Sequence, residues 1–154
     1  MAWTVIGFGK YQGKTLPQIV LTDPDWFFWA IENNIFKSVT LRAEAEEIRR
    51  KATRIAIPVT NPSELKVEYT IHPGVGKLAD VSVVPVRRPA HEGASSTYRT
   101  DHFDLSMPRK IAPYDKTGGK IILDAIKHHV FGNRNARLTR ARCEAFFEDD
   151  SNFA

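Results

Sequence analysis

The spacing of apolar residues changes once along the chain, and this change constrains the possible folds more than any other feature. Between residues 41 and 55 the apolar residues recur at helical spacing, at Leu41, Ala45, Ile48, Ala52 and Ile55. Between residues 65 and 71 they alternate with polar residues, as they do in a half-buried strand. Pro58 and Asn61-Pro62 break the chain between the two patterns. The sequence therefore predicts a mainly helical first part, then a sheet.

The first part is predicted to contain four elements, each with a recognisable start. The apolar run at residues 3–8 is rich in aromatic and β-branched residues, and glycines follow it. Polar residues that cap helices precede the other three elements. The four are a strand at residues 3–8, a short helical turn capped by Thr15, a helix that starts at Asp23-Pro24-Asp25, and a helix at about residues 41–54 capped by Thr40.

The second part is predicted to form a small antiparallel sheet with two helices. The elements are strands at residues 65–71, 78–86 and about 103–107, an exposed flexible loop at 87–97, and helices at about 120–131 and 136–147. The chain is therefore predicted to be α+β: an N-terminal strand-turn-helix module, then about three antiparallel strands packed with two C-terminal helices. The open edges of such a sheet allow a homodimer. The predicted divisions are residues 1–57, 63–148 and an acidic tail at 149–154.

Residues 7–20 contain G-K-T and G-F-G, which occur in nucleotide-binding loops. A phosphate loop needs a glycine where Phe8 stands, and the helix after it must open at once, whereas Pro17 follows here. The dinucleotide fingerprint needs a glycine where Gln12 stands. The spacing therefore argues against both kinds of nucleotide site.

Composition limits the location and the partners. The lone Cys143 excludes an internal disulfide and a Cys-rich zinc site, which fits a reducing cytoplasm. No apolar run approaches the ~20 residues needed to cross a membrane, and no signal peptide is visible at the start. The formal net charge is +4. Basic residues gather at residues 37–54 and 134–142, and such clusters are typical of nucleic-acid-binding surfaces. We expect a cytoplasmic protein with no membrane association, no cofactor and no resident metal.

One set of residues near the N-terminus is typical of a small module. The set is Phe8-Gly9-Lys10-Tyr11-x-Gly13-Lys14-Thr15-Leu16, Ile19 and Asp23-Pro24-x-Trp26-x-x-Trp29. It resembles the module at the C-terminal end of bacterial exodeoxyribonuclease X, which also occurs in stand-alone proteins of the quorum-sensing-regulated virulence factor family. The resemblance covers residues 6–36 and implies a strand-turn-helix unit associated with DNA processing. It implies no active site, because the acidic catalytic residues of the exonuclease lie in a separate domain.

These observations favour a non-catalytic nucleic-acid-binding accessory protein of a phage or bacterial DNA-processing system. Lysines on a glycine turn and arginines on a late helix would contact phosphates, and an aromatic ring could stack on a base. The expected partner is single- or double-stranded DNA. The predicted nucleic-acid-binding residues are Lys10, Tyr11, Lys14, Arg134, Arg137 and Arg140. Affinity would then fall steeply with salt.

Three alternatives stay open. The aromatic run at residues 26–29 or the loop at 87–97 could bind a host protein. His102, Asp104 and His128 could instead assemble the metal site of a nuclease. The start of the helix at Thr117-Gly118-Gly119-Lys120 could offer free N–H groups to an anion.

Overall fold

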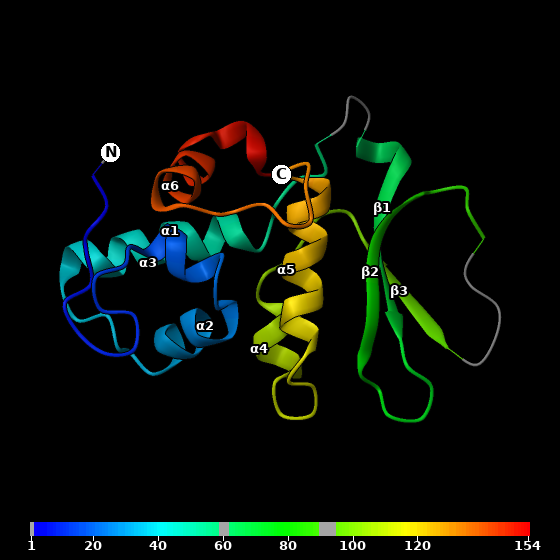
Figure 1. Ribbon diagram of the computed structural model, residues 1–154, viewed down its shortest axis with the longest axis horizontal. Helices are drawn as coiled ribbons and strands as arrows, with labels where there is room; N and C mark the ends of the chain where they lie inside the picture. Colours follow the sequence, from blue (N-terminus) through cyan, green and yellow to red (C-terminus); the bar gives the residue numbers. More distant parts are fainter. Residues whose placement is uncertain (1, 59–61, 90–94) are drawn as a thin grey trace.

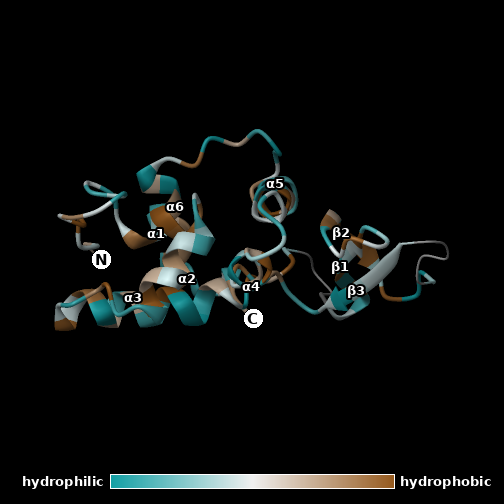
Figure 2. Ribbon diagram, turned by 90° about the horizontal axis from the view of Figure 1, so that it is seen from below, coloured by the Kyte–Doolittle hydropathy of each residue, from teal (hydrophilic) through white to brown (hydrophobic). Residues whose placement is uncertain are grey.

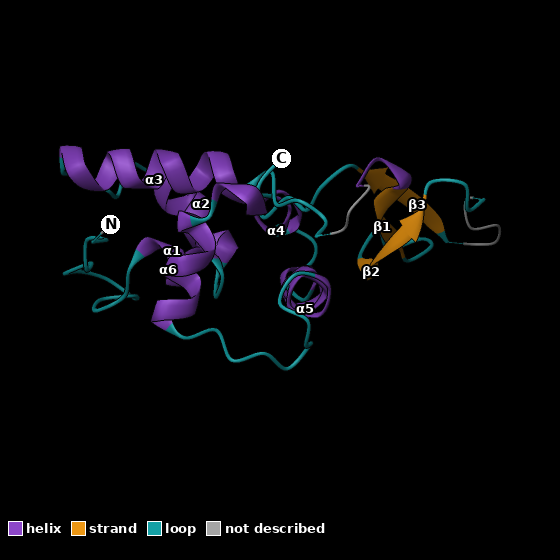
Figure 3. Cartoon of the chain, turned by 90° about the horizontal axis from the view of Figure 1, so that it is seen from above, coloured by secondary structure: helices purple, strands orange, loops and turns teal. Residues whose placement is uncertain are grey.

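The chain folds into a helical part and a three-stranded sheet, with two helices between them (Figure 1). The computed structural model describes all residues except 1, 59–61 and 90–94. At one end lie α1 (Leu16–Val20), α2 (Pro24–Glu32), α3 (Val39–Ala52) and α6 (Arg140–Glu148). At the other end lie β1 (Leu65–Ile71), β2 (Leu78–Pro85) and β3 (Ser96–Thr100). The view from above also places α4 (Met107–Ile111) and α5 (Gly118–His129) between these two parts (Figure 3). Two short 3-10 helices, η1 (Pro62–Glu64) and η2 (Asp150–Asn152), complete the fold.

Short polar side chains start the helices of the first part. The Asp23 carboxylate accepts a hydrogen bond from the Trp26 N–H (3.2 Å), and Pro24 occupies the first helical position of α2, as the sequence predicts. Helix α3 begins earlier than predicted, because the Ser38 hydroxyl, rather than Thr40, accepts from the Leu41 N–H (3.0 Å). The ribbon of α3 is largely hydrophilic in Figure 2, in keeping with one buried face and one solvated face.

The sheet is antiparallel with strand order β2-β1-β3, so the α+β class and the three strands are confirmed. Tyr69 lies at its centre, opposite Val81 on one side and Tyr98 on the other. Tyr69 and Val81 are buried, and α5 packs against β2. Tyr98 on the edge strand is 55% exposed, so side chains on β3 are less buried than those at the centre of the sheet.

The strand predicted at residues 3–8 is wrong: none of the described residues there is in a strand. The segment instead closes a loop on itself, with hydrogen bonds from the Ile6 N–H to the Lys14 carbonyl (2.9 Å) and from the Gly13 N–H to the Ile6 carbonyl (2.8 Å). Gly9 and Gly13 have positive φ, which allows the tight reversal. Trp3 and Ile6 are buried against helices, so their apolar character reflects helix packing rather than a sheet.

The third strand was predicted in the wrong place. β3 begins in the last two residues of the segment predicted to be loop and continues to Thr100, whereas the alternating segment at residues 103–107 crosses from the sheet to α3. The Phe103 N–H donates to the Ile55 carbonyl (2.9 Å), the Leu105 N–H donates to the Ala52 carbonyl (3.0 Å), and α4 begins at Met107. Pro108 suits the first turn of a helix better than a strand. Of the loop predicted at 87–97, residues 90–94 lie outside the described residues.

The last helix is shorter than predicted and packs elsewhere. α6 begins at Arg140 after the cap Thr139, and it packs on α1 rather than on the sheet. Its buried side chains are Cys143, Phe146 and Phe147, whereas Ala141 and Ala145 are exposed.

The C-terminal residues dock on α3. The buried Lys51 ammonium donates to the Phe147 carbonyl (2.8 Å) and pairs with Glu47 (3.2 Å) and Asp150 (3.0 Å). Ile55 makes isolated bridges with both Phe103 and Phe153. The buried apolar side chains on both sides of residues 57–63 form one cluster, so the helical part and the sheet share a core.

Candidate polyanion-binding groove

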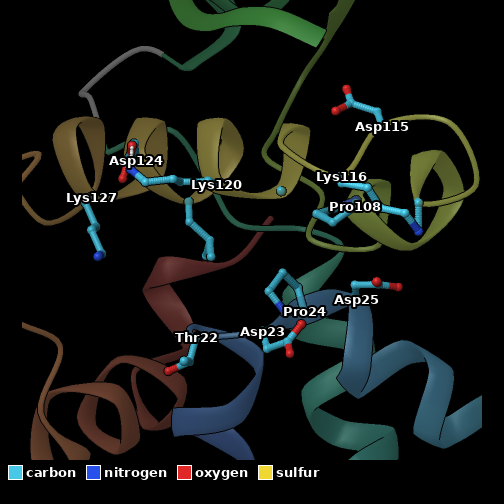
Figure 4. Close-up of a pocket in the computed structure, with 13 residues that line it drawn as sticks. Thr22, Asp23, Pro24, Asp25, Pro108, Asp115, Lys116, Lys120, Asp124 and Lys127 are labelled. Carbon is cyan, nitrogen blue, oxygen red and sulfur yellow. Dashed lines mark hydrogen bonds and ion pairs between the residues drawn. The ribbon is translucent and has the colours of Figure 1, made fainter. Parts of the chain in front are cut away.

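A groove of about 370 Å³ separates the corner between α1 and α2 from the helices α4 and α5 (Figure 4). We call it the α5 groove. Its charged lining comprises Asp23 and Asp25 on the corner, and Lys116, Lys120, Asp124 and Lys127 on the opposite wall, with Asp115 at the turn before α5. Apolar groups lie between the charges, among them Pro24, Pro108 and Leu123. The two walls come from segments about ninety residues apart in the sequence, so only the fold brings them together.

Three lysines run along the α5 wall. Lys116 precedes the helix, and Lys120 and Lys127 stand seven residues apart on it, which is about two turns and places them on one side. In Figure 4, Lys127 points toward the corner of α1 and α2, whereas Lys120 lies along the helix toward Asp124. Among the residues that the structure describes, Lys116 and Lys127 have no carboxylate within ion-pair distance. The wall therefore offers cationic groups that the protein does not neutralise.

Asp124 connects this wall to the region of predicted arginines. Its carboxylate lies 2.9 Å from the Lys120 ammonium and 3.8 Å from the Arg134 guanidinium. The Asp124 side chain is 17% exposed, whereas those of Lys120 and Arg134 are 80% and 72% exposed. One largely covered acid thus holds two exposed cations side by side. Their combined charge remains positive.

Asp115 fixes the start of α5. It is 3% exposed, and its carboxylate accepts hydrogen bonds from the backbone N–H groups of Leu78 (2.8 Å), Thr117 (3.0 Å) and Gly118 (2.8 Å). Burial alone would raise the pKa of Asp115, but these hydrogen bonds lower it below its usual value. The N–H groups of Thr117 and Gly118, which the sequence left open as an anion site, are therefore occupied by the protein's own carboxylate.

Gly118 is also required by close packing. A Cβ atom added there would lie 2.5 Å from Ile111 Cδ1 and 2.7 Å from Asp115 Oδ2. Gly118 thus lets the carboxylate of Asp115 approach the backbone. It does not form a phosphate cradle.

Asp23 organises the opposite wall. Besides capping α2, it accepts a short hydrogen bond from the Tyr11 hydroxyl, and the Lys10 ammonium lies 3.5 Å away. Burial, the hydrogen bond to Asp23 and the charge of Asp23 all raise the pKa of Tyr11 above its ordinary value. The Tyr11 ring also packs edge-on against Trp26, with centroids 5.1 Å apart. Tyr11 is therefore held in place by its hydroxyl contact with Asp23 and by its ring contact with Trp26.

Asp25 stands on the same wall with fewer partners. One of its oxygens lies 3.4 Å from the Arg109 guanidinium, which also contacts Glu32 at 3.1 Å. The Asp25 side chain is 44% exposed. It therefore keeps acceptor capacity at the edge of the groove.

The six predicted nucleic-acid-binding residues fall into two groups. Lys10 and Tyr11 contact Asp23, and Arg134 contacts Asp124, so these three adjoin the lining of the α5 groove. Lys14, Arg137 and Arg140 do not line it. Arg140 pairs with Glu144 (3.0 Å). The helical face that Arg137 and Arg140 were predicted to share does not exist, because α6 begins only at Arg140.

The residues of the metal-nuclease alternative occupy separate places. Asp104 accepts hydrogen bonds from the Ser106 N–H (2.8 Å) and hydroxyl (2.6 Å). His128 lies on α5 with its ring edge-on to His129, and it lines a different groove from Lys127. The carbonyl of His102 accepts from the Thr100 hydroxyl (2.8 Å). Within the described part of the chain, no three His, Cys, Asp or Glu side chains are grouped so that they could hold a metal ion.

The aromatic run at residues 26–29 is largely used in the core. Phe27 and Phe28 are buried, Trp26 is half-buried, and Trp29 is 37% exposed. Such a helix presents only one large aromatic side chain to a partner. Separately, the described helices include none that is long and apolar enough to cross a membrane.

The sequence held a signal for the α5 lysines. Lys120 and Lys127 follow helical spacing within the predicted helix at about 120–131, because seven residues return a side chain close to the same direction on a helix. The arginines of residues 134–142 drew the prediction instead, since they are denser in the sequence. No family model matches the chain, and neither the curated proteins nor the solved structures include a significant match. The resemblance of residues 6–36 to the exonuclease X module thus stays a prediction.

Proposed function

We propose that the protein binds nucleic acid through phosphates held along the α5 groove. The observation that carries the proposal is the row of Lys116, Lys120 and Lys127 on one wall, two of them without an acidic partner in the described structure. Lysine is a common phosphate ligand, because its compact charge can serve successive phosphates without strict geometry. Arg134, held next to Lys120 by Asp124, extends the same cationic row.

The proposed role is binding without catalysis. The acids near the groove each have a structural partner: Asp115 holds the start of α5, Asp23 caps α2, and Asp124 joins two cations. We keep the cytoplasmic accessory role in DNA processing that the sequence suggests. The lysine row supports the phosphate contact. The biological setting rests on the sequence resemblance.

A salt-titrated binding assay tests the proposal. Fluorescently labelled single-stranded DNA, duplex DNA and RNA are titrated with protein at several salt concentrations. For wild type we expect log K to fall linearly with log salt, because binding releases counterions from the phosphates. In Lys116→Ala/Lys127→Ala the slope of log K against log salt should decrease in magnitude by about two, since each lysine–phosphate contact contributes about one. Neither substitution leaves an acid unpaired.

The matched control removes the same charge elsewhere. Lys37→Ala/Lys77→Ala replaces two exposed lysines that also lack an ion-pair partner in the described structure and do not line the groove. We expect its slope to remain near that of wild type. Equal losses in both double variants would mean that only net charge matters, and no binding at low salt would refute the proposed function.

A further inference from the structure

We infer that the α5 groove selects single-stranded nucleic acid and that the Asp25 carboxylate favours bases with an amino group on their edge. This inference rests on the proposed function. It specifies that the bound nucleic acid is single-stranded and that Asp25 contacts a base. It follows from the size of the groove and from the different charges of its two walls.

The groove is too small in volume to enclose a duplex. Its volume of about 370 Å³ is at the lower end of the range for sites that bury a single small ligand, about 300–1,000 Å³. The α5 wall from Gly118 to Lys127 spans roughly 14 Å of helix. This length covers about four steps of a stacked strand at about 3.4 Å per step. We infer that one unpaired nucleotide occupies the groove while its neighbours continue along the lysines, whereas a base pair is too large for this volume.

The two walls suit the two sides of a single strand. Lysines face from α5, and the carboxylate of Asp25 stands on the α2 side. Pro24, Pro108 and Leu123 supply apolar contact between these polar groups. A nucleotide in a single strand exposes a phosphate on one side and an unpaired base edge on the other. With its phosphate on the lysines, its base edge faces the α2 wall.

Asp25 has the acceptor capacity that this contact requires. Among the described residues only Arg109 bonds to it, at 3.4 Å from one oxygen, and the side chain is 44% exposed. Asp23 is less suitable, because Trp26, Tyr11 and Lys10 already use its oxygens. A carboxylate accepts hydrogen bonds and does not donate them. It therefore favours the amino group of cytosine over the carbonyl oxygen that thymine carries at the same position.

The experiment compares labelled oligo-dC and oligo-dT of equal length, and a mixed-sequence strand with its duplex. Thymine also carries an N3–H donor and a C5 methyl group, but two carbonyl oxygens flank that N–H and repel a carboxylate. We expect wild type to bind oligo-dC about fivefold more tightly than oligo-dT, and the single strand more tightly than the duplex. Asp25→Asn should remove the dC preference while keeping the salt slope, because an amide can pair with either base. Glu64→Gln, which neutralises an exposed acid on η1, controls for the change in net charge.

The outcomes separate this inference from the proposed function. Equal binding of oligo-dC and oligo-dT by wild type, or a dC preference that survives in Asp25→Asn, would overturn the role of Asp25. Duplex bound as tightly as single strand would overturn strand selection. In each case, loss of salt slope in Lys116→Ala/Lys127→Ala would still support phosphate binding at the groove. Loss of the dC preference in Asp25→Asn but not in Glu64→Gln, together with weaker binding of the duplex, supports the inference.

Discussion

The glycine turn before α1, with Lys10 and Lys14, adjoins the corner of α1 and α2, and we call the two together the N-terminal corner. This corner and the α5 wall both carry lysines, but the protein uses them differently. In the corner, Lys10 lies near Asp23, which also accepts from Tyr11. On the α5 wall, Asp124 pairs with Lys120, whereas the buried Asp115 is bonded to backbone N–H groups and engages no lysine in the described structure. The comparison teaches that the position of the acids decides which cations remain available. The number of lysines and arginines in a segment does not.

The largest effect is expected where Asp115 is removed. Asp115→Ala leaves the N–H groups of Leu78, Thr117 and Gly118 without their acceptor. Each unsatisfied buried group costs about 1–3 kcal/mol, and water can reach the exposed Thr117, so we expect a loss of roughly 3 kcal/mol in the free energy of unfolding. Urea denaturation measures it. Glu64→Ala, which removes an exposed acid from η1, should change stability little. A loss below about 1 kcal/mol would show that Asp115 does not hold α5.

A smaller effect is expected at the acid of the corner. Asp23→Ala removes the cap of α2, which typically costs about 0.5–2 kcal/mol. The same change should lower the pKa of Tyr11 toward its ordinary value, because the hydrogen bond and the neighbouring charge are lost while the burial remains. Ultraviolet titration of the tyrosines, with Tyr11→Phe to identify the signal, measures the shift. An unchanged Tyr11 titration would contradict the contact with Asp23.

These two acids also show how far the sequence could predict the molecule. The cap at Asp23 was predictable, because Asp-Pro before an apolar run is a local signal for a helix start. The role of Asp115 was not, since one of its three partners is Leu78 on another element. Periodicity likewise located α2, α3, β1, β2 and α5, whose patterns each lie within one element. It failed at residues 103–107, where apolar alternation comes from a crossing segment that is buried between α3 and the sheet.

The candidate site was predictable only in part, for the same reason. The types of residue that bind phosphate were evident, and three of the predicted residues adjoin the groove. Which cations stay unpaired depends on acids from distant segments, as with Arg134 and Asp124. The groove itself exists because the corner at Asp23-Pro24-Asp25 packs near α4 and α5, and no local pattern encodes that approach.

The comparison of the two lysine groups can be tested directly by binding. Lys10→Ala/Lys14→Ala and Lys116→Ala/Lys127→Ala remove equal charge from the corner and from the α5 wall. Because the α5 pair lines the groove and the corner pair does not, we expect the α5 variant to reduce the salt slope by about two contacts and the corner variant by less than about one. Thermal unfolding of both variants checks that the fold is kept. A larger reduction for the corner pair would move the binding surface to the glycine turn.

The smallest expected effect is the pH dependence that Asp115 contributes. Its pKa is lowered in the folded protein, so its charge stabilises the fold above the unfolded value of about 4, and this stabilisation is lost as the pH falls through the folded value. Asp115→Asn keeps one oxygen acceptor but no charge, and at neutral pH it should be less stable than wild type by about 1 kcal/mol. The difference between the two proteins should narrow on acidification below about pH 4. Urea midpoints measured from pH 6 to pH 3 test this, and a constant or widening difference would mean that charge at Asp115 does not stabilise the turn before α5. Asp115 would then act as a neutral hydrogen-bond acceptor. The difference between the two regions would then lie only in which lysines have an acidic partner.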